Sequence, residues 1–286
     1  MKEKHKYNID YIKSQCIGDA YELRGVQTVL LEMLCNFDAL CRENGYAYYL
    51  AGGTLLGAVR HNGFIPWDDD IDVIMPRADY EKFIKFPKLN DSLEVVTYND
   101  SKGYYHPYPY GNITDTNTIM VEHNARYLTG KGQFLDVFPL DEVPDDSTER
   151  EKYYERLKRL KYLKGLQNNQ FKKCTTPKNV AFNCGVAISM LFDEMKLCRK
   201  IDEMAKMFAE TDSNTLATVF VGNTYKQTWP KSIFDSAVEV DFEGHKFFAP
   251  RDYDRFLTIQ YGDYMKLPPV EERVCHHGVE LYRRKK

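Results

Sequence analysis

Four aspartates fall within residues 68–72, directly before an apolar run that has the pattern of a buried strand. On a strand, residues two apart point to the same face and lie about 7 Å apart along the backbone. Asp70 and Asp72 are therefore expected to project together, while Ile71 and Val73 face the core. Two convergent carboxylates repel each other strongly unless a cation or a shared proton neutralises them. The motif predicts a strand that presents a pair of acids to a ligand.

A divalent metal is the ligand that this pair of acids favours. Oxygen ligands that leave coordination positions open suit Mg²⁺ or Mn²⁺ better than zinc. A third carboxylate on a neighbouring strand would complete a site for two metals about 4 Å apart. Asp136 has the character of that third acid, because it is flanked by apolar residues in a predicted strand over residues 133–141.

A calcium loop and a solvated edge strand both fit the aspartates less well. A calcium loop of the EF-hand type requires glycine at its sixth position and glutamate at its twelfth. Counted from Asp68, these positions hold Val73 and Asp79. A solvated edge strand would carry the charge for solubility, but nearby apolar residues such as Ile65 and Ile74 favour burial instead.

A glycine pair precedes the aspartates, between a predicted short strand and a predicted helix. Gly52 and Gly53 would leave bare backbone N–H groups at a helix N-terminus, where phosphate groups bind. Thr54 is expected to cap that helix through its hydroxyl group. Arg60, at the end of the same helix, is a candidate for neutralising phosphate, with an ordinary surface arginine as the alternative. Together, the glycine pair, the helix and the acids predict a site in which backbone amides and metal bind a diphosphate or triphosphate ester.

The periodicity along the chain predicts one α+β domain over residues 1–286. A catalytic core covers about 24–145 and 213–277, and a helical insertion covers about 146–212. The core opens on an amphipathic helix that Gly45 is well placed to end as a left-handed cap.

Overall composition excludes several classes of function. The formal charge of −3 over 286 residues gives no general attraction for nucleic acid, so no nucleic-acid partner is expected. The first 15 residues lack the apolar segment of a signal peptide, and the longest weakly polar run, at 179–192, is too short to span a bilayer. Seven scattered cysteines include no C-x-x-C pair, which favours reduced thiols over zinc or redox chemistry. A cytoplasmic location is expected.

Three blocks of the sequence resemble the LicD family of phosphotransferases. In chain order they read GGTLLGAVRHNGFIPWDDDIDVIMPRADYEKF, then NTIMVEH with GQFLDVFPLDEVP, and then FEGHKFFAPRDYDRFLTIQYGDYMKLPP. The resemblance covers roughly residues 46–277, and the fukutin-type proteins of animals share the same core. Since the family belongs to the nucleotidyltransferase superfamily, the resemblance implies a core like that of DNA polymerase beta, with a mixed sheet flanked by helices.

The resemblance also implies a phosphotransferase of the CDP-alcohol type, in which an acceptor hydroxyl attacks the β-phosphate and CMP is released. The best-known members transfer phosphocholine from CDP-choline to sugars of teichoic acid or lipopolysaccharide. By the same resemblance, Asp70, Asp72 and Asp136 are catalytic metal ligands, and Asp136 also orients or deprotonates the acceptor. The residues implied in binding substrate or phosphate are Gly52, Gly53, Thr54, Arg60, Asp69, Asp141 and His277.

One position departs from the family pattern. Asn112 stands where many members have a lysine, so a contact with phosphate or acceptor is expected to be missing or to come from Arg126 or Lys131. His276 and His277 fall where members tend to be basic, and they either contact phosphate or belong to a solvated tail.

The sequence leaves the donor headgroup and any membrane contact open. A quaternary ammonium group favours an aromatic cage, and one tyrosine-rich loop either forms such a cage or packs a surface loop. Its tyrosines are Tyr104, Tyr105, Tyr108 and Tyr110. The basic helix at 155–164 and the terminal RRKK either rest on the anionic inner leaflet, where lipid-linked glycan acceptors are assembled, or form solvated faces.

Three alternative functions follow from the same residues. A nucleotidyltransferase would move a nucleotidyl group from an NTP to a small hydroxyl compound, such as an aminoglycoside, and release pyrophosphate. A glycosyltransferase that binds a UDP-sugar through D-x-D would need a nucleotide-binding βα unit upstream, where a single amphipathic helix is predicted. A scaffold with a dead site would be free to lose Asp70, Asp72 and Asp136, which are all present.

Overall fold

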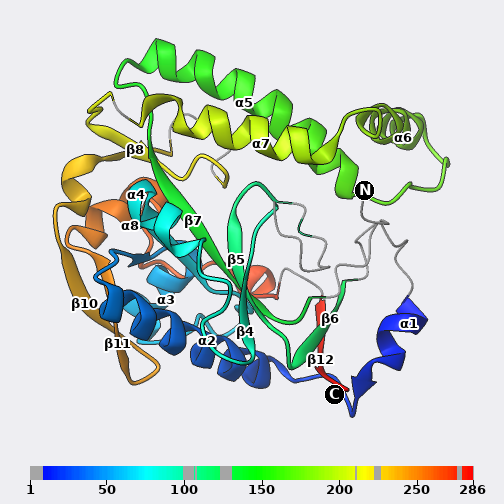
Figure 1. The fold of residues 1–286 in the computed structure, drawn as a ribbon, viewed down its shortest axis with the longest axis horizontal. Helices are drawn as coiled ribbons and strands as arrows, with labels where there is room; N and C mark the ends of the chain where they lie inside the picture. The colour runs from blue at the N-terminus through cyan, green and yellow to red at the C-terminus, as the bar shows by residue number, and fades with distance from the viewer. Residues whose placement is uncertain are drawn as a thin grey trace.

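Asp72 and Asp136 lie in a mixed seven-stranded sheet whose strands come from distant parts of the chain (Figure 1). The computed structural model describes residues 9–98, 106, 108–122, 131–209, 211–221, 227–275 and 279–285. The strand order is β2-β3-β7-β5-β4, with β8 paired to β7 and β9 paired to β8. The bounds are Tyr49–Leu50 (β2), Asp72–Pro76 (β3), Leu93–Val96 (β4), Gly111–Asp115 (β5), Phe134–Glu142 (β7), Thr215–Ala217 (β8) and Trp229–Pro230 (β9).

The two faces of this sheet have different neighbours because side chains alternate along each strand. Val73, Val137 and Ile113 share one face and belong to the main core, together with the buried residues of α2 (Leu23–Asn44). Asp72 and Asp136 point to the opposite face. As predicted, Gly45 ends α2 in the left-handed conformation, with a φ of 67°.

Three helices form a layer beside the aspartate face: α5 (Ser147–Asn168), α6 (Pro177–Ser189) and α7 (Glu194–Ala205). In Figure 1, α5 and α7 run side by side across the end of β7, and α6 extends beyond them at one end. Tyr153, Leu157 and Ile201 form a second, smaller core with residues of the β8 region. The helical layer therefore has its own apolar contacts and leaves space above the aspartates.

The remaining α-helices and strands surround the sheet. They are α1 (Ile9–Ser14), β1 (Cys16–Ile17), α3 (Gly52–His61), α4 (Arg77–Phe83), β6 (Thr118–Glu122), β10 (Ala237–Phe242), β11 (His245–Pro250), α8 (Tyr253–Tyr261) and β12 (Val279–Arg284). Strands β1, β12 and β6 form a three-stranded sheet, and β10 pairs with β11. Within these described ranges no helix combines the length and apolar character needed to cross a bilayer.

The α+β prediction with a mixed sheet is confirmed, but two local predictions are wrong. The helix after the glycine pair begins at Gly52 with Ala51 as its N-cap, so Thr54 lies inside the helix and does not cap it. The strand begins at Asp72, so Asp70 precedes it and its direction is not set by strand alternation.

Candidate active site

A row of three polar side chains crosses the centre of the sheet. β3 and β7 are parallel, and Asp72 is in register with Asp136. β5 is antiparallel to β7, and Asn112 is opposite Asp136. Residues that are directly opposite on neighbouring strands share a face. Asp72, Asp136 and Asn112 therefore present their side chains side by side, and the expected pairing of the D-x-D acid with a later acid is present in the structure.

The carboxylates in this row repel one another. The pKa of Asp72 is raised well above its usual range, first by burial and then by the negative charges of Asp70, Asp136 and Asp68. A bound cation would reverse the effect, because it favours the charged form of each carboxylate. The cluster therefore favours a positively charged ligand on electrostatic grounds.

The residues present fit a magnesium site that substrate completes. Among the described residues, no group of three or more His, Cys, Asp or Glu side chains is arranged to hold a metal ion. Mg²⁺, however, commonly binds through one or two carboxylates, with water and substrate phosphates as its other ligands. Asp72 and Asp136 supply two adjacent carboxylates, and Asp70 lines the same pocket.

The glycine pair allows the first turn of α3 to approach these acids. A Cβ atom on Gly52 would lie 3.0 Å from Oδ2 of Asp72, and one on Gly53 would lie 2.7 Å from Oδ2 of Asp68. Gly52 also has a φ of 53°, which favours glycine. Buried Thr54 accepts a hydrogen bond from the backbone N–H of Asp72 at 2.9 Å, so its hydroxyl fixes the start of β3.

Arg60 is bound to main-chain carbonyl groups. Its guanidinium donates to the carbonyl oxygens of Tyr264 (2.9 Å) and Lys266 (3.4 Å) in the segment after α8. The pKa of Arg60 is lowered by burial and by the nearby charge of Arg273. Arg60 is not among the residues that line the pocket at the aspartates.

Asp69 and Asp141 also contact other parts of the chain. Oδ2 of Asp69 accepts a hydrogen bond from the thiol of Cys275 at 2.9 Å. Asp141 forms a bidentate ion pair with Arg77, with N···O distances of 2.6 and 2.8 Å, and its side chain is only 1% exposed. His277, like His276, lies outside the described residues.

A pocket of about 430 Å³ lies over the aspartate row. One wall is the sheet, with Asp70, Asp72 and Asp136, and the opposite wall is a face of α5 that carries Lys161 and Lys164. Gly165 and Asn168 complete that face, at the spacing that places helix residues on one side. Burial lowers the pKa of Lys161 to about 8. These lysines were not predicted at the site, because the basic helix was expected to face a membrane or solvent.

Aromatic rings form a further wall of the pocket, and we refer to Tyr108, Tyr110, Phe138 and Phe220 as the aromatic wall. Tyr108 stacks on Tyr110 with ring centroids 5.4 Å apart. Tyr110 contacts Phe138 at 4.6 Å and Phe220 at 6.1 Å. Of the predicted tyrosine cage, Tyr108 and Tyr110 are thus at the pocket, whereas Tyr104 and Tyr105 lie outside the described residues.

Asn112 and Lys131 belong to different networks. Buried Asn112 accepts a hydrogen bond from the hydroxyl of Thr114 at 3.3 Å, beside Asp136. The ammonium group of Lys131 contacts Nδ1 of buried His106, whose other ring nitrogen meets the carbonyl of Tyr110. Lys131 therefore supports the loop of the aromatic wall and does not line the pocket, and Arg126 lies outside the described residues.

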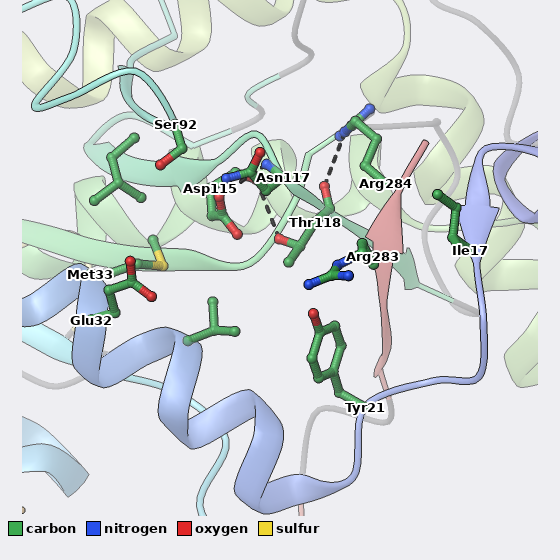
Figure 2. A pocket seen from close by; sticks show the side chains of 12 residues that line it. Ile17, Tyr21, Glu32, Met33, Ser92, Asp115, Asn117, Thr118, Arg283 and Arg284 are labelled. Atoms are coloured by element: carbon green, nitrogen blue, oxygen red, sulfur yellow. Dashed lines mark hydrogen bonds between the residues drawn. The ribbon is translucent and has the colours of Figure 1, made fainter. Parts of the chain in front are cut away.

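A second cavity, of about 620 Å³, lies on the other side of the sheet (Figure 2). Leu93 and Asp115 line it from the strand face that packs against α2, opposite the aspartate row. Figure 2 shows Glu32 and Met33 of α2 at one end, and Tyr21, Arg283 and Arg284 at the other. Since the sheet separates the two cavities, groups in this one do not face Asp72 and Asp136.

Comparisons with known proteins identify the family of this chain. Residues 45–179, which include the aspartate row, match the family model described as LicD/FKTN/FKRP, nucleotidyltransferase domain. The chain is 32% identical over 265 residues to the lipopolysaccharide cholinephosphotransferase LicD of Haemophilus influenzae, a match that covers 91% of this chain and 97% of that relative. The chain therefore belongs to the LicD family of transferases.

Shorter matches extend the comparison to distant relatives. The mannosyltransferase regulator 4 of Saccharomyces cerevisiae is 26% identical over 136 residues, which cover 48% of this chain and 10% of that protein. An uncharacterized protein of Rickettsia prowazekii is 41% identical over 60 residues, 21% of this chain and 23% of the relative.

Proposed function

We propose that this protein transfers phosphocholine from CDP-choline to a hydroxyl group of a lipopolysaccharide or teichoic acid precursor at the cytoplasmic face of the membrane, and releases CMP. The observation that carries the proposal is the pocket, in which acids, lysines and aromatic rings occupy separate walls. The Haemophilus relative, named as a cholinephosphotransferase, supports phosphocholine as the transferred group. The same acids would serve a nucleotidyltransferase, so the released product decides between the two.

In this proposal Asp72 and Asp136 hold Mg²⁺, or Mn²⁺, which neutralises charge on the donor diphosphate when bound. The acceptor oxygen forms a bond to the β-phosphorus, and the bond from that phosphorus to the CMP oxygen breaks. Asp136 orients the acceptor hydroxyl and takes its proton. Thr54 keeps Asp72 in place through the backbone N–H of that residue.

Lys161 is assigned to the donor phosphates. The carboxylates of the pocket and a diphosphate together carry more negative charge than one divalent metal neutralises. Lys164 is already paired with Glu194 at 2.8 Å, and both of these side chains are buried. Lys161 donates to the carbonyl oxygen of Val219 at 3.1 Å, which holds its ammonium group at the pocket.

Replacing Lys161 by methionine is expected to lower kcat/KM for CDP-choline about 10- to 100-fold, the usual effect of losing a charge-assisted hydrogen bond. Lys161→Arg should retain most activity. Because the pKa of Lys161 is about 8 and the protonated form binds phosphate, kcat/KM should fall as the pH rises through that value. The arginine variant should extend activity to higher pH, whereas a pH effect that arises elsewhere in the protein would be the same in both proteins.

The matched control for this prediction is Lys158→Met. Lys158 lies one turn earlier on α5, and its side chain is 67% exposed. Steady-state kinetics of CMP release from pH 6 to 9 measure both variants. An unchanged kcat/KM in Lys161→Met would remove this lysine from the proposed donor site.

The aromatic wall is expected to select choline among the possible headgroups. A quaternary ammonium group gains up to about 2 kcal/mol from desolvated aromatic faces, so CDP-choline should be used at least about tenfold more efficiently than CDP-glycerol or CDP-ribitol. Tyr108→Leu should reduce that preference, and Tyr162→Leu, at an exposed position of α5, should leave it unchanged. CMP release is measured for CDP-choline, CDP-ethanolamine, CDP-glycerol and CDP-ribitol with Mg²⁺.

The same set of donors tests the proposed function as a whole. Pyrophosphate release from ATP or CTP, without CMP from any of these donors, would refute the proposed function.

A further inference from the structure

Exposed apolar side chains are concentrated at one end of the helical layer. Seven of the eighteen large hydrophobic side chains that are exposed on the described chain lie within residues 171–195. Leu191 is 83% exposed, and the others are Phe171, Val180, Ile188, Met190, Phe192 and Met195. In Figure 1, α6 lies at an extremity of the molecule, beyond the ends of α5 and α7. We call residues 171–200 the tip.

The exposed turn of the tip is held firmly to α5. The side-chain amide of Gln167 donates to the carbonyl oxygens of Ser189 (2.7 Å) and Phe192 (2.9 Å), and Gln167 is buried. The buried ion pair between Lys164 and Glu194 fixes the start of α7 in the same way. Ordered apolar side chains that remain exposed mark an interaction surface.

The tip is strongly basic, although the whole chain has a formal charge of −3. Its two acids are Asp193 and Glu194, and Glu194 is neutralised by Lys164. Its six basic side chains are all exposed: Lys172, Lys173, Lys178, Lys196, Arg199 and Lys200. A second copy of the tip would bring like charges together, whereas an anionic surface complements both the charge and the apolar side chains.

We propose that the tip docks on the surface of an anionic phospholipid bilayer. Leu191 and Phe192 enter the interfacial region, and the lysines lie among the lipid headgroups. This inference differs from the expectation for the 155–164 helix, since Lys161 and Lys164 on that helix line the pocket. It does not depend on the proposed reaction.

Docking at the tip would also place the pocket close to the bilayer. Lys161 and Gln167 lie on the same helix, about 9 Å apart at the helical rise of 1.5 Å per residue. The residue that anchors the exposed turn is thus next to residues that line the pocket. An acceptor carried on a membrane lipid would then be close to the pocket.

Flotation with vesicles of phosphatidylcholine and phosphatidylglycerol, without donor or metal, tests the proposal. The full-length protein should bind vesicles that contain phosphatidylglycerol, and binding should weaken as salt is raised. Leu191→Gln with Phe192→Gln should reduce binding about tenfold or more, because two apolar anchors are lost. The variant should keep its circular dichroism and its CMP release toward a water-soluble acceptor.

The control variant is Met265→Gln with Val270→Gln, which changes two exposed apolar residues in the segment after α8. It should bind vesicles as the unmodified protein does. Equal binding by the tip variant, or no binding of the unmodified protein to anionic vesicles, would overturn the proposal. So would a dimer in sedimentation analysis that the tip variant loses, since the tip would then be a subunit interface.

Discussion

Asp72→Asn is expected to lower kcat for CMP release by about 10³-fold, the scale associated with losing a group that stabilises developing charge. Asparagine has nearly the same shape as aspartate but carries no negative charge to hold a divalent metal. Because Asp72 is in register with Asp136, the substitution removes one of the two adjacent carboxylates. Steady-state kinetics with saturating Mg²⁺ measure the effect, with Asp91→Asn, a fully exposed acid, as the control.

The same variant should be more stable than the unmodified protein when metal is absent. Burial and the charges of Asp70 and Asp136 raise the pKa of Asp72, so its charged form opposes folding at neutral pH. A folded-state pKa above the unfolded value means that stability falls as the pH rises from the unfolded value to the folded one. Urea titration with EDTA at pH 7 should show the gain for Asp72→Asn. Wild-type activity in this variant would refute the metal assignment.

Asp141→Ala is expected to reduce the free energy of unfolding by about 3 kcal/mol, because it leaves the buried guanidinium of Arg77 without its bidentate partner. Asp202 and Glu81 still contact Arg77, at 3.1 and 3.2 Å, and keep the loss at the lower end of the usual range. Urea unfolding followed by circular dichroism measures it.

Asp241→Ala is the matched control for that loss. Asp241 pairs with Lys246 at 2.8 Å, but both side chains are more than half exposed. Exposed pairs contribute about 0–1 kcal/mol, so little change is expected.

A different variant, Asp141→Asn, distinguishes a structural role from a substrate contact. If it lost activity while its unfolding midpoint stayed the same, Asp141 would be a substrate contact, as the family resemblance implies. Its pairing with Arg77 would then be secondary.

The parts of the fold that local patterns determine could be predicted from the sequence. The helix that ends at Gly45 follows from its apolar spacing. The sequence also predicts that Asp72 and Asp136 are neighbours, because Asp72 begins one apolar strand and Asp136 lies within another. The sequence predicts Thr54 as the helix cap, but the helix begins at Gly52. Glycine tolerates the positive φ at this position, so the chain turns into the helix before Thr54.

Contacts between distant segments could not be predicted in this way. Lys161 reaches the pocket because α5 crosses the aspartate face, and that path depends on packing against the β8 region. The pairing of Asp141 with Arg77 joins residues 64 positions apart, and in the sequence the family resemblance implies only that Asp141 contacts substrate. The periodicity of α5 identified a basic helix but not the surface that it faces.

The parallel pairing of β3 with β7 also determines when the site forms during folding. Asp72 and Asp136 lie 64 residues apart and meet only when this loop has closed, which is slow compared with forming a helix. β7 additionally pairs with β5 and β8, so the acids come together as the central sheet is completed. In a chain whose central sheet is incomplete, Asp72 and Asp136 are therefore not yet held next to each other. Recovery of activity on refolding therefore requires the central sheet to be complete, in addition to the packing of α5 over it.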